Sequence, residues 1–401
     1  MREPQRMRTR THQQVHGQFY TGAAYGALLV DRLLDEAVDL AVELGVGNGA
    51  LLSAVTGRWP RARCISVDID PLHQYTQYVR DSHSHYCMDA LDLGLLGAIG
   101  LEQGAADVAV CNPPFVTPHW RPAFADILRR AGLPLPINAA RIGADVLFLA
   151  QNLWMLRKQG QLGIIVPDGI ISGAKSRPIR EALIAQHRIR EVIELPQKAF
   201  KGIEVRTFIL NICKDHQSTK HVRLLRCDEE GNLEPSITVT QEEATNRMDY
   251  SFYSWKQSSL IAPVDPCFNS KIQVIRGNVS TALAKENLWR VLHTTDITPF
   301  SNREDFVIPS DITFQPNKVC AQPGDVLVAR VGRNLEGKIV KISSGTAIIS
   351  DCLYAIRSKH VSPETIFRAL NSESGQAWIK AHAHGACAQF ITKADLSRFP
   401  F

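Results

Sequence analysis

The chain has 401 residues, of which 45% are hydrophobic and 21% charged, and its formal net charge is +5. This is the composition of an ordinary soluble globular protein with a sizeable core, and the length predicts two or more domains. No apolar run is long enough for a membrane-spanning helix, and the basic, polar residues 1–14 exclude a secretory signal or an anchor there. The mildly basic charge permits a polyanionic partner without requiring one.

The first half of the chain alternates helical and strand patterns. Apolar residues spaced three and four apart predict helices over residues 23–40 and 144–158. Short runs of apolar and β-branched residues predict strands at 41–44, 64–70, 106–111, 160–170, 190–195 and 206–214. Strands that alternate with helices favour a doubly wound, mostly parallel sheet covered on both faces, so the predicted fold class is α/β.

The character of the sequence changes after about residue 215. Polar stretches come first, and short strands follow, most clearly in residues 323–332 and 337–358, whose turns carry Gly, Pro and Asn. This pattern predicts a C-terminal mixed α+β domain with antiparallel pairing. The predicted boundary lies near residue 245, which gives domains of residues 1–245 and 246–401.

Glycines and acids follow the first two predicted strands. Glu43 is followed by Gly45 and Gly47 in a G-x-G-x-G turn that leads into a helix, and such a turn lets the backbone approach a ligand closely. The second strand ends at Asp68, which is placed to accept hydrogen bonds from both ribose hydroxyls. Asp70 is the second choice, with capping of the next helix as its alternative role.

A third acid, Asp89, stands where the third strand is expected to end, and its carboxylate could accept from an adenine amino group. The carboxyl ends of parallel strands meet at one edge of a sheet, so these acids together predict a bound nucleoside. The glycine spacing differs from the G-x-G-x-x-G of dinucleotide folds, and the pattern shows no second nucleotide-binding half.

The strand at 106–111 stops at Asn112-Pro113-Pro114-Phe115. Proline donates no backbone hydrogen bond, so two in succession cannot continue a central strand. The Asn112 side-chain oxygen and the Pro113 carbonyl are two acceptors that can grip a planar amino group, and Phe115 offers a stacking face. A plain turn is the alternative, and the three preceding motifs argue against it.

These residues resemble the (N/D)-P-P-(Y/F/W) signature of S-adenosylmethionine-dependent amino methyltransferases. In particular, the chain is similar to DNA adenine-N6 methyltransferases whose cofactor motifs precede the target-recognition region, over most of its first 215 residues. GQFYTG at 17–22 resembles that family's N-terminal motif, with Gly22 in place of the usual Pro, and implies that Thr21 lies near the cofactor's methionine end. The resemblance implies cofactor contacts for Tyr20, Thr21, Glu43, Gly45, Gly47, Asp68, Ile69, Asp89 and Ala90.

Residues 199–214 resemble the family's late hairpin, in which an aromatic residue sits against the target base, and Phe200 is the matching position. The resemblance implies a flipped adenine that Asn112 and Pro113 hold and that Phe115 and Phe200 sandwich. Its amine would attack the sulfonium methyl group directly, without a covalent enzyme intermediate.

The C-terminal region bears on the substrate. Residues 247–253, 323–342, 350–358 and 370–401 resemble the target-recognition domains of type I restriction specificity subunits. Four basic residues of one predicted hairpin could bind phosphates or, for arginine, read guanine edges: Arg330, Arg333, Lys338 and Lys341. A solvated hairpin face is the alternative. The basic residues 1–10 form an arm that either adds non-specific DNA affinity or has no role.

Cysteine and histidine usage narrows the setting. The nine cysteines form no C-x-x-C pair and most lie in apolar segments, which predicts buried thiols rather than disulfides. The histidine pairs at 83/85 and 382/384 have no accompanying ligand cluster, so no metal site is predicted. Together with the absence of a targeting segment, these features favour a cytoplasmic protein.

The sequence therefore predicts a site-specific methyltransferase that acts on N6 of adenine in double-stranded DNA, within a restriction-modification or epigenetic system. A separate restriction endonuclease is an open partner, because no P-D-(D/E)-x-K nuclease motif occurs in the chain. The alternatives are the same chemistry on RNA adenine or on a protein glutamine amide, and a non-catalytic DNA-binding subunit. The recognition sequence, the methylation of one strand or both, and the choice between monomer and dimer stay open.

Overall fold

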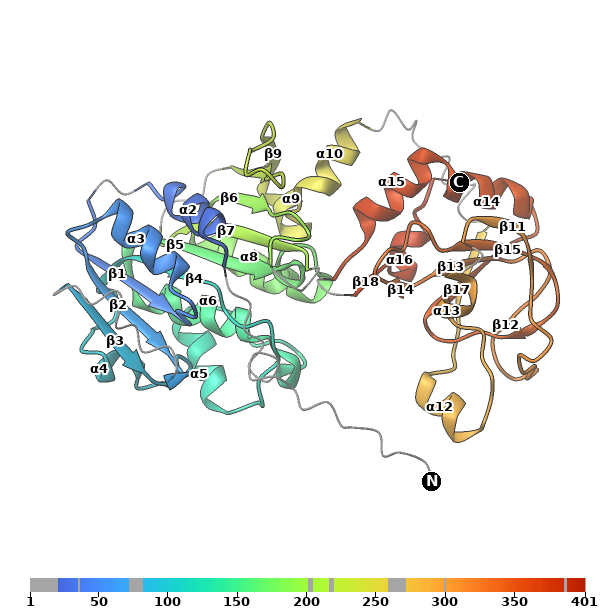
Figure 1. Ribbon diagram of the computed structural model, residues 1–401, viewed down its shortest axis with the longest axis horizontal. Helices are drawn as coiled ribbons and strands as arrows, with labels where there is room; N and C mark the ends of the chain where they lie inside the picture. Colours follow the sequence, from blue (N-terminus) through green and yellow to red (C-terminus); the bar gives the residue numbers. More distant parts are fainter. Residues whose placement is uncertain are drawn as a thin grey trace, which may run out of the picture. The chain divides into compact units, whose positions relative to one another are not determined.

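The computed structural model describes residues 21–34, 37–71, 82–200, 205–215, 220–258, 272–298, 301–385 and 388–400. The chain divides into two compact units, Met1–Tyr250 and Ser251–Phe401 (Figure 1). The sequence predicted a boundary near residue 245. Within the described ranges, no helix has both the length and the apolar character needed to cross a membrane.

The first unit contains one large sheet. Its strands are β1 (Leu40–Leu44), β2 (Arg63–Asp68), β3 (His83–Cys87), β4 (Ala106–Cys111), β5 (Leu156–Pro167), β6 (Arg188–Glu194), β7 (Thr207–Cys213), β8 (His221–Arg226) and β9 (Ile237–Thr240). They form a nine-stranded sheet with the order β3-β2-β1-β4-β5-β7-β6-β8-β9. The strands from β3 to β5 run parallel, whereas β7 is antiparallel to its neighbours β5 and β6. The predicted α/β class with a mostly parallel sheet is confirmed.

Helices cover both faces of this sheet. The first unit contains α2 (Ala23–Asp31), α3 (Ala50–Arg58), α4 (Leu95–Ala98), α5 (Ala123–Arg130), α6 (Ala144–Met155), α7 (Asp168–Ile171), α8 (Arg177–Gln186) and α9 (Gln241–Asn246). Figure 1 shows α2 and α3 on one face and α5 and α6 on the other. Leu29 of α2 and Leu51 of α3 share one buried cluster with Val108 and Val110, alternate residues of β4 that point to the same face.

Two helices end earlier than their predicted bounds. Helix α2 was predicted to continue to residue 40, but it ends at Asp31. The guanidinium of Arg58 donates hydrogen bonds to the carbonyl oxygens of Val30 (2.5 Å) and Leu33 (2.7 Å) at this end of the chain segment, where carbonyl groups have no partner one turn further along the helix. Helix α6 stops before Leu156, because that residue is extended (φ −70°, ψ 140°) and already begins β5. The chain therefore passes from helix to strand without a loop.

The strand order reverses beside β1, which lies between β2 and β4. Leu44, the last residue of β1, pairs with Val67 on one side and with Cys111 on the other. The three strands therefore end at one edge, and the chain leaves them there in different directions. In open parallel sheets, ligand sites form at such a reversal.

The second unit contains β10 (Ile272–Arg276), β11 (Arg303–Val307), β12 (Cys320–Ala321), β13 (Val326–Ala329), β14 (Val331–Gly332), β15 (Ile339–Ser344), β16 (Ala347–Ile348), β17 (Leu353–Ser358) and β18 (Gln389–Phe390). Five of them form a sheet with the order β10-β17-β13-β15-β11. Its helices are α12 (Thr281–Glu286), α13 (Thr294–Ile297), α14 (Pro363–Asn371), α15 (Glu373–His382) and α16 (Lys393–Leu396), and α10 (Tyr250–Ser258) begins at the last residue of the first unit. Val326 and Val328 face one apolar cluster and Leu327 faces another, so both faces of this sheet are covered.

Candidate active site

The first strand leads into the predicted glycine turn. Gly45, Gly47 and Gly49 have φ angles of +72°, +50° and +75°, a left-handed conformation that only glycine adopts without strain. The backbone N–H of Gly45 donates to the carbonyl of Val67 (2.8 Å), which ties the turn to the end of β2. Helix α3 begins directly after Gly49, so the backbone of the turn borders the edge where the strands end.

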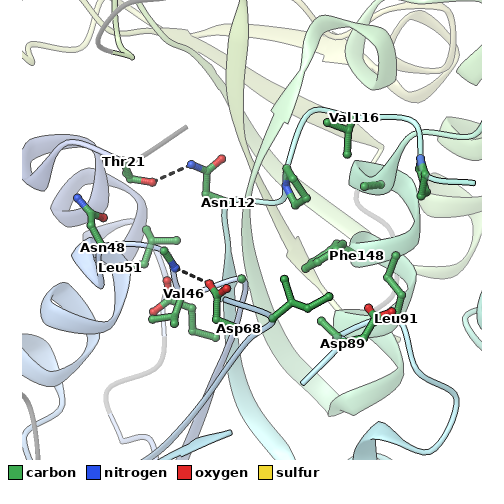
Figure 2. Close-up of a pocket in the computed structure, with 18 of the residues that line it drawn as sticks. Thr21, Val46, Asn48, Leu51, Asp68, Asp89, Leu91, Asn112, Val116 and Phe148 are labelled. Atoms are coloured by element: carbon green, nitrogen blue, oxygen red, sulfur yellow. Dashed lines mark hydrogen bonds between the residues drawn. The ribbon is translucent and has the colours of Figure 1, made fainter. Parts of the chain in front are cut away.

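A cavity of about 280 Å³ lies at the carboxyl ends of β1, β2 and β4 (Figure 2). The predicted cofactor residues that line it are Thr21, Glu43, Gly45, Gly47, Asp68, Ile69, Asp89 and Ala90. Asn112 and Pro114 line it as well. These residues come from five segments that are widely separated in the sequence, and one cavity brings them together. Tyr20 lies outside the described residues.

Asp68 is held in a fixed orientation beside the turn. It is 5% exposed, and its Oδ2 accepts the N–H of Gly47 while its Oδ1 accepts the N–H of Asp70, both at 2.9 Å. Each carboxylate oxygen has a second lone pair, so both can still accept from a ligand hydroxyl. Asp70 is buried but does not line the cavity, so Asp68 is the better placed of the two candidates.

Glu43 is a buried acid at the end of β1, with 2% of its surface exposed. Burial raises the pKa of its carboxyl well above the usual range, the backbone N–H of Leu52 opposes this shift, and the carboxylate of Asp68 adds to it. Its Oε2 has no hydrogen-bond partner among the described residues. A cationic group in the cavity would favour the ionised form of Glu43.

Asp89 forms the rim of the cavity with Arg121. The Nη2 of Arg121 donates to Asp89 Oδ2, and the N–H of Leu91 donates to Asp89 Oδ1, both at 2.9 Å. The side chain of Arg121 is 47% exposed and that of Asp89 is 35% exposed, so water screens this ion pair. The Arg121 guanidinium also lies over the ring of Phe124, 4.7 Å from its centroid. Arg121 was not predicted, because nothing in its local pattern points to Asp89.

Asn112 follows β4 and faces Thr21 across the cavity edge. The Asn112 Nδ2 donates to Thr21 Oγ1 at 3.0 Å, and Figure 2 shows the amide oxygen turned the other way. Thr21 is 5% exposed. The amide that the sequence predicted as an acceptor is therefore tied through its nitrogen to the segment before α2.

The two predicted base-stacking rings contact each other. Phe115 and Phe200 meet edge to face, with centroids 6.2 Å apart and ring planes at 82°. Phe200 is 2% exposed and belongs to the core cluster. A base needs parallel rings on its two sides, so the predicted sandwich requires Phe200 to move from this position.

Helix α6 supplies wall residues that the sequence did not point to. Ala144 and Phe148 line the cavity together with Val116. The N–H of Ala144 donates to the carbonyl of Val116 (2.8 Å), which joins the start of α6 to the loop after β4. A Cβ on Gly45 would lie 3.4 Å from the Phe148 ring. Phe148 is not among the residues whose spacing of three and four predicted α6, so the local pattern does not identify its use.

The four predicted DNA-binding residues lie in the second unit and differ in their surroundings. Arg330 Nε donates to the carbonyl of Asp351 (2.6 Å). In the described part of the chain, no carboxylate pairs with Arg333 or Lys338. Lys341 Nζ lies 2.6 Å from Glu364 and 3.7 Å from Glu304, so its charge is already balanced by acids of its own unit.

Comparison with known proteins gives one family. The family described as N-6 DNA Methylase matches residues 80–278, a range that contains Asp89, Asn112 and Phe200 but not the glycine turn or Asp68. No curated protein matches the sequence.

Several solved structures are similar to the chain. The type IIG restriction endonuclease BpuSI is 15% identical, with 94% of this chain and 58% of that chain covered and a TM-score of 0.49. A type I restriction-modification methyltransferase subunit from Streptococcus thermophilus is 18% identical, with 62% of this chain and 56% of that chain covered and a TM-score of 0.43. A putative class I S-adenosylmethionine-dependent methyltransferase from Listeria monocytogenes is 21% identical, with 53% of this chain and 67% of that chain covered and a TM-score of 0.42. The chain spans little more than half the length of the first two.

Proposed function

We propose that the chain is a site-specific DNA methyltransferase that transfers a methyl group from S-adenosylmethionine to N6 of adenine in duplex DNA. The observation that carries the proposal is the position of Asn112. It stands at the end of β4, inside the range that matches N-6 DNA methylases, and lines a cavity shared with Glu43, Asp68 and Asp89. An acceptor for an amine therefore lies beside acceptors for a nucleoside.

The residues of the cavity suit S-adenosylmethionine. Glu43 is a buried carboxyl for a cationic group, Asp68 can accept from two ribose hydroxyls, and Asp89 can accept from an adenine amino group. Val46 and Phe148 add apolar wall for the adenine ring and for the carbons bonded to the sulfonium. When bound, S-adenosylmethionine supplies an electrophilic methyl group on a sulfonium.

Asn112 and Pro113 would hold the amine of the target adenine. The Asn112 side-chain oxygen and the Pro113 carbonyl oxygen accept hydrogen bonds from the two N–H groups of this amine. These hydrogen bonds turn the nitrogen lone pair away from the ring. These two oxygens also stabilise the positive charge that develops on the nitrogen, and their effect is large because Pro113 is buried and Asn112 is half-buried. No acid or base is needed to activate the nitrogen before it reacts, and the methylated nitrogen afterwards loses one proton to solvent.

The target adenine has to leave the duplex to reach Asn112. We propose that it stacks on Phe115, and that Phe200 moves from its edge-on contact if it stacks on the second face. Duplex binding would fall largely to the second unit, through Arg330, Arg333 and Lys338, with a smaller share for Lys341 because Glu364 already holds its ammonium.

The test is single-molecule sequencing of DNA from cells that express the chain, with Asn112→Ala as the matched control. We expect N6-methyladenine in one sequence motif for the unaltered chain and none for the variant, while both bind DNA alike. Unmodified DNA together with methylated RNA, or with a protein methylated on a glutamine amide, would assign the same chemistry to another substrate. No methylation of any of these would point to a non-catalytic subunit.

A further inference from the structure

Thr21 is held in place by the helix that follows it. Gly22 caps α2, and its carbonyl accepts from the N–H groups of Tyr25 and Gly26, both at 3.1 Å. A Cβ on Gly26 would lie 3.1 Å from the carbonyl oxygen of Ala50, so the absence of a side chain lets α2 lie close against α3. Leu29, one turn further along α2, is fully buried in the core. Thr21 is thus positioned by packing, not by its own side chain.

The contact between Thr21 and Asn112 has a direction. An amide side chain has a donor end and an acceptor end of nearly the same shape, so packing alone distinguishes its two orientations poorly. Because Thr21 Oγ1 accepts from Nδ2 at 3.0 Å, Oδ1 takes the opposite position, as Figure 2 shows. In the flipped orientation, Asn112 would present N–H groups to an incoming amine, and donor would face donor.

We propose that Thr21 is a positioning residue that sets the amide orientation of Asn112, so that its oxygen faces the target amine. This inference rests on the proposed function. Thr21 also lines the cavity, and a role in holding the cofactor alone would give a different experimental result. The orienting role depends on the chemical asymmetry of an amide, and a carboxylate in place of Asn112 has no such asymmetry.

A double-mutant cycle separates the two roles. Thr21→Val is measured in the presence of Asn112 and in combination with Asn112→Asp, whose two oxygens are both acceptors. With Asn112 present, we expect Thr21→Val to lower the single-turnover methylation rate at saturating cofactor by roughly 10- to 100-fold, as for other residues that orient a functional side chain. Together with Asn112→Asp, the same change should alter the rate by less than about threefold.

Thr21→Ser and Thr56→Val complete the set. Serine keeps the acceptor oxygen, so Thr21→Ser should keep a rate within about threefold of the unaltered chain. Thr56→Val removes the hydrogen bond from Thr56 Oγ1 to the carbonyl of Ser53 (3.1 Å) on α3, and Thr56 is not among the cavity residues. It should leave the rate unchanged. Cofactor affinity is measured for each variant by calorimetry.

The outcomes are distinct. An equal loss from Thr21→Val with Asn112 and with Asn112→Asp, or a loss seen only in cofactor affinity, would overturn the inference and leave a cofactor-binding role. If Asn112→Asp has no measurable rate, Thr21→Ser decides: retention of the rate supports the inference, and a loss as large as that of Thr21→Val overturns it. If the unaltered chain methylates no DNA, the proposed function itself fails, and the inference with it.

Discussion

Glu43 has a carboxyl group whose charge depends on what the cavity contains. Burial raises its pKa well above the usual range, so the protonated form persists to higher pH than in an exposed glutamate. S-adenosylmethionine carries a sulfonium and an ammonium, and either of them near Glu43 would favour the carboxylate. Binding of this cofactor is therefore expected to release a proton.

We expect the affinity for S-adenosylmethionine to rise with pH above the ordinary glutamate range, by up to tenfold per pH unit for as long as the Glu43 carboxyl of the free protein is protonated. The affinity rises with pH because the pKa of Glu43 is raised in the free protein. At low pH its carboxyl is protonated and cofactor binding must remove that proton, and the free-energy cost of removing it falls as the pH rises. The rise ends at the pH where the Glu43 carboxyl is already ionised in the free protein. Calorimetry at several pH values measures this affinity. An equally steep rise of affinity with pH for Glu43→Gln would contradict the expectation.

At the scale of the elements, the turn after β1 requires glycine. Gly45 has a φ of +72°, and its Cβ would stand 3.4 Å from Phe148 in the cavity wall. Gly57, in α3, has no heavy atom within 4 Å of its Cβ position and no positive φ. The same substitution should therefore have opposite effects at the two positions.

Gly45→Ala is expected to lower the free energy of unfolding by about 1–2 kcal/mol, because alanine is strained in the left-handed region. It should also weaken cofactor binding. Gly57→Ala is expected to raise the free energy of unfolding by about 0.5–1 kcal/mol, because alanine favours the helix. Urea unfolding and calorimetry test both, and a loss of stability from Gly57→Ala as large as that from Gly45→Ala would argue against this account.

The segment after α9 is held in the first unit by buried charges. Asp249 is fully buried and accepts two hydrogen bonds from Arg247 (2.7 and 2.8 Å) and one from Arg206 (3.3 Å). Arg206 stands before β7 and also reaches Glu194, the last residue of β6 (3.2 Å). Burial would raise the pKa of Asp249, but Arg247 and Arg206 hold it at about 2. This cluster ties two central strands to the last residues of the unit.

Asp249→Asn is expected to destabilise the first unit by about 3–5 kcal/mol, because it removes the buried carboxylate that Arg247 and Arg206 share. The depressed pKa places this stabilisation above the unfolded value of about 3.8, and it is lost as the pH falls toward 2. Thermal unfolding at pH 7 and at pH 3 measures both effects. The matched control is Glu181→Gln, which breaks an exposed pair with Arg177 (3.0 Å) and should cost less than about 0.5 kcal/mol. Similar losses from the two variants would refute the role of the cluster.

At the scale of the whole molecule, the cavity and the basic hairpin belong to different units. The cavity is built from the first unit alone, whereas Arg333 and Lys338 lie in the second. Replacing both with alanine is expected to weaken DNA binding and to lower the slope of log affinity against log salt by about 1 to 2, one for each lost phosphate contact. Cofactor affinity should not change.

Lys341→Ala is the matched comparison for the hairpin. Its ammonium is already balanced by Glu364 and Glu304, so the salt slope should stay close to that of the unaltered chain. Filter binding or fluorescence anisotropy over a range of salt concentrations measures the slopes. A drop in slope for Lys341→Ala of half that seen for the double variant would show that Lys341 contributes as much as Arg333 and Lys338 do.

The strand ends of the first unit were predictable because they depend on local pattern. A run of apolar residues that stops at glycines, at Asp68 or at two prolines marks the end of a buried strand, whatever the rest of the chain does. Parallel pairing then requires these ends to share one edge. For this reason Glu43, Asp68 and Asn112 were predicted to lie together, with Asp89 added from its spacing, and all four line the cavity.

The tertiary structure alone decided which partner each of these side chains has. Thr21 meets Asn112 across 91 positions of sequence, Arg121 meets Asp89 across 32, and Phe115 contacts the buried Phe200 edge-on. Such pairs depend on how helices pack on a sheet, and the local sequence of one segment does not predict that packing. The sequence by itself thus determined the fold class and the chemical types gathered at the sheet edge, while packing determined their orientation, because hydrogen-bond direction is set only where distant segments meet.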